Sequence, residues 1–451
     1  MKRARPSLGG RGAVAAALLL AFGAGPAAAW PERLEGHGGP VRGLAVSAER
    51  GELLSASFDY AIIHRALKDG GSAVLNRLIG HEAAVNDVAF VPGRPLAVSA
   101  SDDGSVGVWN LDTGEMVTRF KGPGDKVLDV AVSENGAVAA GAFWDRTARV
   151  YDLDTMSERA VMRGHGGNVN AVALAGEGNI LYTGSYDGTV RQWNARSGEL
   201  LRIVLKHGWS VNVVAVLPEE THLLYGAQDG AAGIIDIASG EVVAEFEPFG
   251  GPVLAAAIDP AHHLAAVAGA DGHLRVYRMD DWSVARDYST AYGPIWAVGF
   301  TPDGKALYRG GLDDFASLVS LEPGAPLDVA RTDYPRRFQM SAGTDPGERQ
   351  FARKCSVCHT LTPNDANRAG PTLHGVFGRR VGTLPGYPYS DALRNSDIVW
   401  SQETISDLFD RGPDVVLPGT KMPVQRLRNA EDLAALVAFL KRATGAETGN
   451  N

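Results

Sequence analysis

Two cysteines and a histidine stand together near the C-terminal end of the 451-residue chain. Cys355 and Cys358 are the only cysteines, and His359 follows the second one directly. The spacing C-x-x-C-H is the attachment pattern of c-type haem, in which two thiols bond to the vinyl groups and the histidine binds the iron. A redox-active C-x-x-C or a structural disulfide is the alternative. The adjacent histidine and the absence of other cysteines favour covalent haem.

A methionine further along the chain is the candidate for the second axial ligand. Met422 ends the loop sequence Pro418-Gly419-Thr420-Lys421-Met422, although a methionine there could simply pack. This loop resembles the distal-ligand loop of class I cytochromes c of the mitochondrial type. The resemblance extends over about residues 341–445, where Pro371 and Trp400 also match the order and spacing of that family.

The resemblance implies one covalent haem c and a role for each matching residue. Cys355 and Cys358 would hold the haem, and His359 and Met422 would be its axial ligands. The carbonyl of Pro371 would orient the proximal histidine by accepting its ring N–H. The remaining haem-pocket residues implied by the resemblance are Arg379, Tyr389 and Trp400 near the propionates and Thr420 on the distal side. Packing is the alternative for these last four, and His374 is interpreted as structural rather than as a rival ligand.

Two filled axial positions would leave the iron no open site for a substrate. Ligation by Met and His raises the reduction potential, which favours outer-sphere electron transfer over oxygen chemistry. The mitochondrial type commonly has a polar Asn and Tyr near the distal pocket, whereas this chain has Leu393 and Leu408. We therefore expect a drier pocket and a Met422–iron bond that resists displacement.

Helices are expected to carry these residues. Asp345-Pro346 has the form of a helix N-terminus, with Asp as the N-cap and Pro in the first turn, and that helix leads to Cys355. Ser401 is a plausible N-cap for a second helix. Asn429 is predicted to cap a final helix whose leucines fall on one face.

The preceding 300 residues repeat with a period of about 42. A turn aspartate marks each repeat, at Asp59, Asp103, Asp145, Asp187, Asp229, Asp271 and Asp314. The fourth repeat contains four strand-like segments separated by turns, beginning after Gly164-His165 and including Trp193. Such a period is typical of a repeat architecture.

These repeats resemble the WD40 family, with a Gly-His opening, a turn Asp and a Trp six residues later. The resemblance implies a structural hydrogen-bond network of His165, Asp187, Trp193 and either Thr183 or Ser185. Several repeats depart from the pattern, with Tyr151, Ile235, Tyr277 and Ser320 in the place of Trp. Seven repeats predict a seven-bladed, all-β propeller, which an N-terminal strand near Leu34 would close by completing the last blade.

The first 29 residues have the form of a Sec-type signal peptide. Basic residues precede an apolar run of about 13 residues, from Ala13 to Gly25, which is followed by the cleavage pattern Ala27-Ala28-Ala29. The run is short for a membrane span, so cleavage is expected, with an uncleaved anchor as the alternative. The sequence thus predicts a periplasmic protein with no integral membrane segment after cleavage. We expect a signal peptide (1–29), a propeller (30–324), a linker (325–342) and an all-α cytochrome c domain (343–446).

Charge is unevenly divided between the two predicted domains. The whole chain has a formal net charge of -9, and removal of the signal would bring it to about -13. The haem domain is near +1 and the propeller near -14, which disfavours nucleic-acid binding. Basic residues close in sequence to the haem-binding loops are Arg353, Lys354, Lys421, Arg426 and Arg428. They could surround a haem edge that docks on an acidic partner or on the propeller itself, or they could be an ordinary solvated surface.

Three functions remain open from the sequence. The first is a single-electron carrier whose propeller docks it to a protein partner, with unknown donor and acceptor. The second is a haem c enzyme with a catalytic site in the propeller, although no catalytic constellation is evident there. The third is an assembly protein whose binding responds to the haem redox state. Whether the chain is an enzyme stays uncertain, and an electron carrier is favoured.

Overall fold

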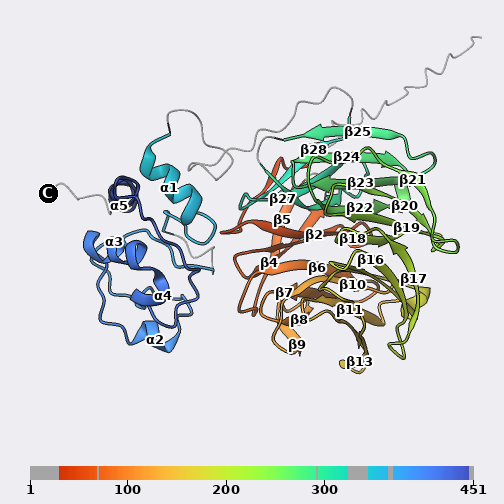
Figure 1. Ribbon diagram of the computed structural model, residues 1–451, viewed down its shortest axis with the longest axis horizontal. Coiled ribbons are helices and arrows are strands. Elements are labelled where there is room, and N and C mark those ends of the chain that lie inside the picture. The colour runs from red at the N-terminus through yellow and green to blue at the C-terminus, as the bar shows by residue number, and fades with distance from the viewer. Residues whose placement is uncertain (1–29, 69–70, 291–292, 323–343, 364–368, 446–451) are drawn as a thin grey trace, which may run out of the picture.

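The computed structural model describes residues 30–68, 71–290, 293–322, 344–363 and 369–445 (Figure 1). It confirms a propeller of seven four-stranded antiparallel sheets followed by a helical domain. The predicted signal peptide and the whole of the predicted linker lie outside the described residues. No helix in the described ranges combines the length and apolar character needed to cross a bilayer.

Six blades are each built from four consecutive strands. Blades one to three contain β2 (Val41–Ser47), β3 (Glu52–Ser57), β4 (Ala61–Lys68), β5 (Gly71–Ile79); β6 (Val85–Val91), β7 (Leu96–Ser101), β8 (Ser105–Asn110), β9 (Met116–Lys121); β10 (Val127–Val132), β11 (Val138–Phe143), β12 (Ala148–Asp152) and β13 (Ser157–Met162). Blades four to six contain β14 (Val169–Ala175), β15 (Ile180–Ser185), β16 (Thr189–Asn194), β17 (Leu200–Lys206); β18 (Val211–Val216), β19 (His222–Ala227), β20 (Ala232–Asp236), β21 (Val242–Glu245); β22 (Val253–Asp259), β23 (Leu264–Gly269), β24 (His273–Arg278) and β25 (Val284–Ser289). Short 3₁₀ turns follow β14 and β22, at Gly176–Gly178 and Pro260–His262.

The seventh blade joins the two ends of the propeller. Its strands β26 (Ile295–Phe300), β27 (Ala306–Gly311) and β28 (Ala316–Ser320) are completed by β1 (Arg33–Leu34). Leu34 pairs with Ala316 and is 2% exposed. The hydroxyl of Tyr308 donates to the carbonyl of Pro31 at 3.0 Å. The ring is therefore closed by hydrogen bonds between its first and last strands.

A four-residue polar network crosses the fourth blade. The hydroxyl of Thr183 accepts from Trp193 Nε1 at 2.8 Å and lies 2.7 Å from His165 Nε2. His165 Nδ1 lies 2.8 Å from Asp187 Oδ2, so the network uses Thr183 and not Ser185. Burial alone would raise the pKa of Asp187, but hydrogen bonds from Thr189 and His165 lower it to about 2. The carboxylate is therefore charged at neutral pH.

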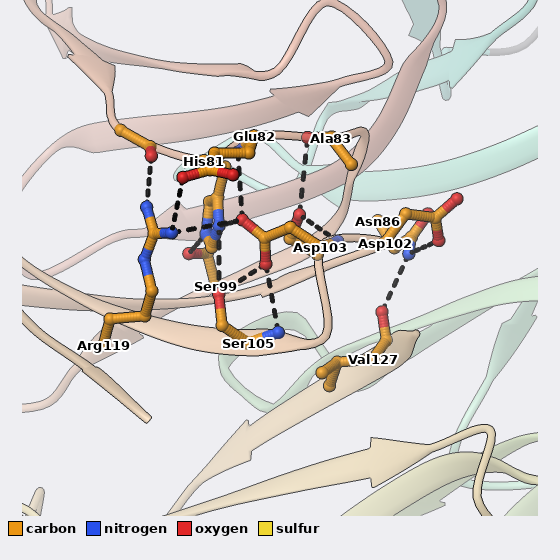
Figure 2. A network of polar contacts seen from close by, with 12 residues as sticks. His81, Glu82, Ala83, Asn86, Ser99, Asp102, Asp103, Ser105, Arg119 and Val127 are labelled. Carbon is orange, nitrogen blue, oxygen red and sulfur yellow. Dashed lines mark hydrogen bonds and ion pairs between the residues drawn. The ribbon is translucent and has the colours of Figure 1, made fainter. Parts of the chain in front are cut away.

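The second blade has the same network, and Figure 2 shows its His81, Ser99 and Asp103. Ser99 Oγ lies 2.7 Å from His81 Nε2 and accepts from Trp109 Nε1 at 2.8 Å, and His81 Nδ1 lies 2.8 Å from Asp103 Oδ2. Trp109 is fully buried. Because these groups satisfy one another, the network holds the start of the blade in a fixed position without leaving a buried polar atom unpaired.

In the helical domain, the first helix packs against the last. The helices are α1 (Pro346–Lys354), α2 (Asp391–Arg394), α3 (Gln402–Arg411), α4 (Pro413–Val416) and α5 (Ala430–Thr444). Asp345, Ser401 and Asn429 cap α1, α3 and α5 with their side chains, as predicted. α1 packs closely on α5 at Gly347, where a Cβ would collide with the carbonyl of Ala435. This contact fixes the N-terminal end of α1 against α5.

Candidate haem site

A cavity of about 610 Å³ opens on the side of the helical domain that faces the propeller. Cys355, Cys358, His359 and Met422 all line it. The first three follow α1 directly, whereas Met422 comes from the loop between α4 and α5. The fold thus gathers two thiols, an imidazole and a thioether around one space.

The turn after α1 places the cysteines and the histidine together. The amide groups of Cys358 and His359 both donate to the carbonyl of Cys355, at 3.0 and 2.9 Å. Cys355 is 4% exposed. Burial raises the pKa of the Cys355 thiol to about 12 and that of Cys358 to about 11. Both sulfurs are therefore neutral in this pocket, and thioethers at the same positions would be neutral as well.

The imidazole of His359 is held by the segment around Pro371. Its Nδ1 lies 2.7 Å from the carbonyl oxygen of Pro371, which can only accept a hydrogen bond. The proton therefore resides on Nδ1, and Nε2 is the nitrogen available for a metal. Burial lowers the pKa of His359, which favours the neutral ring that metals bind. Gly370 allows the close approach, because a Cβ there would lie 2.6 Å from His359 Cε1.

The loop that carries Met422 is held by local hydrogen bonds. The hydroxyl of Thr420 accepts from the amide of Met422 at 3.1 Å, and Ser390 Oγ donates to the carbonyl of Gly419 at 3.1 Å. Gln425 Nε2 donates to the carbonyl of Lys354 at 2.9 Å, which ties this loop to the end of α1. The two sides of the cavity are thereby linked.

The other predicted haem-pocket residues also line the cavity. They are Pro371, Arg379, Tyr389, Trp400 and Thr420. The guanidinium of Arg379 donates to the carbonyls of His374 and Thr372, at 3.0 and 2.7 Å. A role for these side chains at the haem propionates stays a prediction. His374 is absent from the described residues that line the cavity.

Apolar side chains form the rest of the lining from the helical domain. They include Leu373, Val376, Leu393, Ile405, Leu408, Phe409, Leu417 and Leu440. The two leucines that stand where the mitochondrial type has polar residues, Leu393 and Leu408, are both among them. A flat apolar macrocycle fits such walls. The imidazole of His359 and the thioether of Met422, which line the same cavity, suit an iron with one nitrogen and one sulfur ligand. The chemistry of the site therefore fits haem c.

Part of the cavity wall comes from the propeller, which sequence reasoning on the site missed. Phe58, Tyr60, Ile79, Gly80, His81 and Glu82 line the cavity from the first two blades. Burial raises the pKa of Tyr60 to about 12, and its neighbour Cys358 adds to the rise. Only the opposite charges of the two domains pointed to this contact in the sequence.

Sequence comparison agrees with both domains. The family described as "WD domain, G-beta repeat" matches residues 72–110, 114–152 and 156–194. The family described as "Cytochrome c" matches residues 344–444. The WD match covers the region of the two complete polar networks, at His81 and His165.

Several curated proteins resemble the helical domain. Cytochrome c of Sesamum indicum is 42% identical over 98 residues, which are 22% of this chain and 87% of that protein. Cytochrome c of Ginkgo biloba is 39% identical over 112 residues, which are 24% of this chain and 98% of that protein. Cytochrome c2 of Blastochloris viridis is 40% identical over 128 residues, which are 28% of this chain and 87% of that protein.

Proposed function

The chain belongs to the cytochrome c family through residues 344–444, and from this premise we propose that it is an exported single-electron carrier. Its covalent haem c would be bonded to Cys355 and Cys358, with His359 and Met422 as axial ligands. The propeller would be the scaffold that docks the carrier to a protein partner.

The observation that carries this proposal is the convergence of four donors on one cavity. Cys355, Cys358, His359 and Met422 line the same space, although the methionine is more than 60 residues from the others in sequence. Haem c supplies reversible one-electron chemistry at iron when it is bound. The protein's own contribution would be to present Nε2 of a neutral His359, to keep Met422 in the same cavity, and to exclude water with apolar walls.

The location and the role of the propeller are supported by less direct features. Basic residues, an apolar run and Ala27-Ala28-Ala29 at the start of the chain are typical of an export signal, and cytochromes with covalent haem of this kind operate outside the bacterial cytoplasm. WD repeats are stacked sheets whose loops form broad surfaces suited to proteins. A periplasmic docking scaffold is the simplest function that joins these features.

The proposal is tested by producing the full chain in the periplasm of a host that matures c-type haem. We expect one haem per chain that survives denaturation, and a reversible one-electron redox titration. The double variant C355A/C358A should lose the covalent haem. Recovery of the wild-type protein without covalent haem would refute the proposal.

Met422→Ala tests the distal ligand. We expect loss of the Met-to-iron charge-transfer band and a fall in the midpoint potential on the order of 0.1 V, within the roughly 0.8 V that axial ligands span. Met279→Ala is the matched control, because Met279 packs in the propeller core and is not part of the cavity wall. An unchanged band in Met422→Ala would exclude Met422 as the ligand.

A further inference from the structure

We propose that the propeller carries a docking surface for the haem domain of the same chain. This surface covers the edge of the cavity, where an external redox protein would otherwise bind. This surface, the propeller patch, consists of Phe58, Tyr60 and residues 79–82. The inference rests on the proposed electron-transfer function for its consequence, but the docking itself can be measured without it.

The patch lies where two blades meet the helical domain. Phe58 and Tyr60 flank the turn between β3 and β4, and Ile79 ends β5 just before the second blade begins. All three residues share the cavity wall with Cys358 and Met422. In Figure 1 the helical domain lies beside the edge of the propeller that carries β4 and β5. The propeller therefore contributes directly to the space that would hold the haem.

The polar network of the second blade holds His81 and Glu82 of the patch in place (Figure 2). The amide of Glu82 donates to Asp103 Oδ2 at 3.0 Å, and His81 in the patch binds the same carboxylate. The guanidinium of Arg119 donates to the carbonyl of Gly80. A surface that is fixed in this way loses little conformational entropy when it docks.

A hydrogen bond joins the two domains at the patch, and the domains as wholes carry opposite net charges. Lys421 Nζ, next to Met422, donates to the carbonyl of Glu82 at 3.2 Å. Lys354 and Arg394 also line the cavity from the helical domain, and the propeller as a whole is strongly acidic. Attraction between such surfaces weakens as salt rises. One of the basic residues near the haem loops, Lys421, thus contacts the propeller of the same molecule.

Docking at the patch would control which reductants can reach the haem. A protein-sized donor would need the helical domain to separate from the patch, or would have to use another face of the domain. A small reductant would enter with the patch in place. The contact would therefore select among electron donors by size without altering the axial ligands.

The test compares full-chain variants. Ile79→Lys places an ammonium group in the patch, where it would repel Lys354, Lys421 and Arg394, which line the cavity from the helical domain. Tyr60→Gly removes a ring and should fold well, since Tyr60 has φ +70°, a conformation that glycine adopts without strain. Val284→Lys is the control, because Val284 is about as exposed as Ile79, at 50% against 45%, and lies on β25 of the sixth blade.

Small-angle scattering measures docking directly, with or without haem. We expect a larger radius of gyration for Ile79→Lys and Tyr60→Gly than for the wild type, and an increase for the wild type at high salt. Val284→Lys should match the wild type. Identical radii for all four proteins at both salt concentrations would overturn the proposal, whatever the result for haem attachment.

Reduction kinetics measure the consequence of docking. One electron passes from reduced flavodoxin, which is oxidised, to the ferric haem, which becomes ferrous. Both patch variants should accept this electron about tenfold faster or more, the factor that ~1.4 kcal/mol of lost docking free energy produces. Reduction by ascorbate should change less than about twofold on the same scale. Equal acceleration with both reductants, or none with flavodoxin, would contradict size selection by the patch.

Discussion

The proximal histidine shows how few residues are needed to prepare an axial ligand. One carbonyl, from Pro371, fixes the tautomer of His359, and one glycine, Gly370, leaves room for the ring beside the backbone. A hydrogen bond to a backbone carbonyl also makes the other ring nitrogen more basic. The protein therefore chooses the coordinating atom before any iron is bound.

Leu408 offers a residue-scale test of the dry distal pocket. Leu408→Asn would place an amide in the apolar wall and attract water toward Met422. Water near the iron helps a competing ligand to replace the methionine. We therefore expect the Met-to-iron charge-transfer band to disappear at a pH lower by about one unit or more, as a difference of ~1.4 kcal/mol would produce. The measurement is a pH titration of that band.

Leu433→Asn is the matched control for this prediction. Leu433 packs against the same core from α5 but is not part of the cavity wall. Its substitution should lower stability without moving the pH at which the band is lost. If both variants lose the band at the same pH as the wild type, the leucine lining does not protect the iron–methionine bond.

Residue types revealed the donors of the site, but not its propeller wall. Cys355, Cys358 and His359 are adjacent because the covalent chemistry requires that spacing, so a local motif records them. Tyr60 and Ile79 approach the cavity only because two separate domains meet. Neither residue belongs to a motif, since any compact apolar side chain could serve there, and no local pattern could have predicted them.

At the scale of the elements, a single hydroxyl links two other side chains of the fourth blade. Thr183 on β15 serves both His165 and Trp193. Thr183→Val keeps the shape of the side chain but leaves two buried polar atoms without a partner, at a cost of about 1–3 kcal/mol each. We expect a loss of about 2–4 kcal/mol in the free energy of unfolding. Denaturant unfolding followed by Trp fluorescence measures it.

Ser197→Ala controls for the loss of a hydroxyl in the same blade. Ser197 lies in the exposed turn before β17, where its Oγ accepts only from the amide of Glu199 at 3.3 Å. This substitution should cost less than about 1 kcal/mol. Equal losses for the two variants would show that the network does not stabilise the blade.

The elements themselves were largely predictable, because the periodic turn aspartate marks every blade. The sequence did not show which hydroxyl joins each polar network. It also did not show what takes the place of the tryptophan in the blades that lack it. Tyr151 and Tyr277, which replace the tryptophan, stack on Phe120 and Phe246 with ring centroids 4.3 and 3.9 Å apart. Such stacking depends on the outer end of the preceding blade, so a motif within one blade does not reveal it. The short helices α2 and α4 were also missed, because four residues are too few to show a period.

For the whole molecule, the decisive contact is the pairing of β1 with β28. Leu34→Ala would remove the main apolar anchor of β1, and Leu-to-Ala substitutions in cores cost about 2–5 kcal/mol. We expect β1 to detach while the other six blades stay intact. Hydrogen exchange checks this at Leu318, whose amide donates to the carbonyl of Glu32 at 2.9 Å. Exchange there should accelerate at least tenfold for ~1.4 kcal/mol of lost pairing energy.

Leu78→Ala is the corresponding substitution in the first blade. Leu78 is fully buried on β5, the equivalent outer strand, but β5 pairs with β4, which comes shortly before it in the sequence. It should destabilise the propeller without selectively exposing the amide of Leu318. Equal protection of the Leu318 amide in both variants would show that the pairing of β1 with β28 is not a weak point of the propeller.

The pairing of β1 with β28 also imposes an order on folding during synthesis. Trp30 Nε1 donates to Asp303 Oδ2 across 273 residues of sequence, so the first strand emerges long before its partner exists. Contacts of such high sequence separation form late, because a long loop must close before they are rewarded. During that interval β1 has no strand to pair with, and once β28 has formed its outer edge remains open until β1 arrives. A second nascent chain nearby could fill that edge with its own first strand, so strand exchange between copies is the characteristic folding error that this architecture invites.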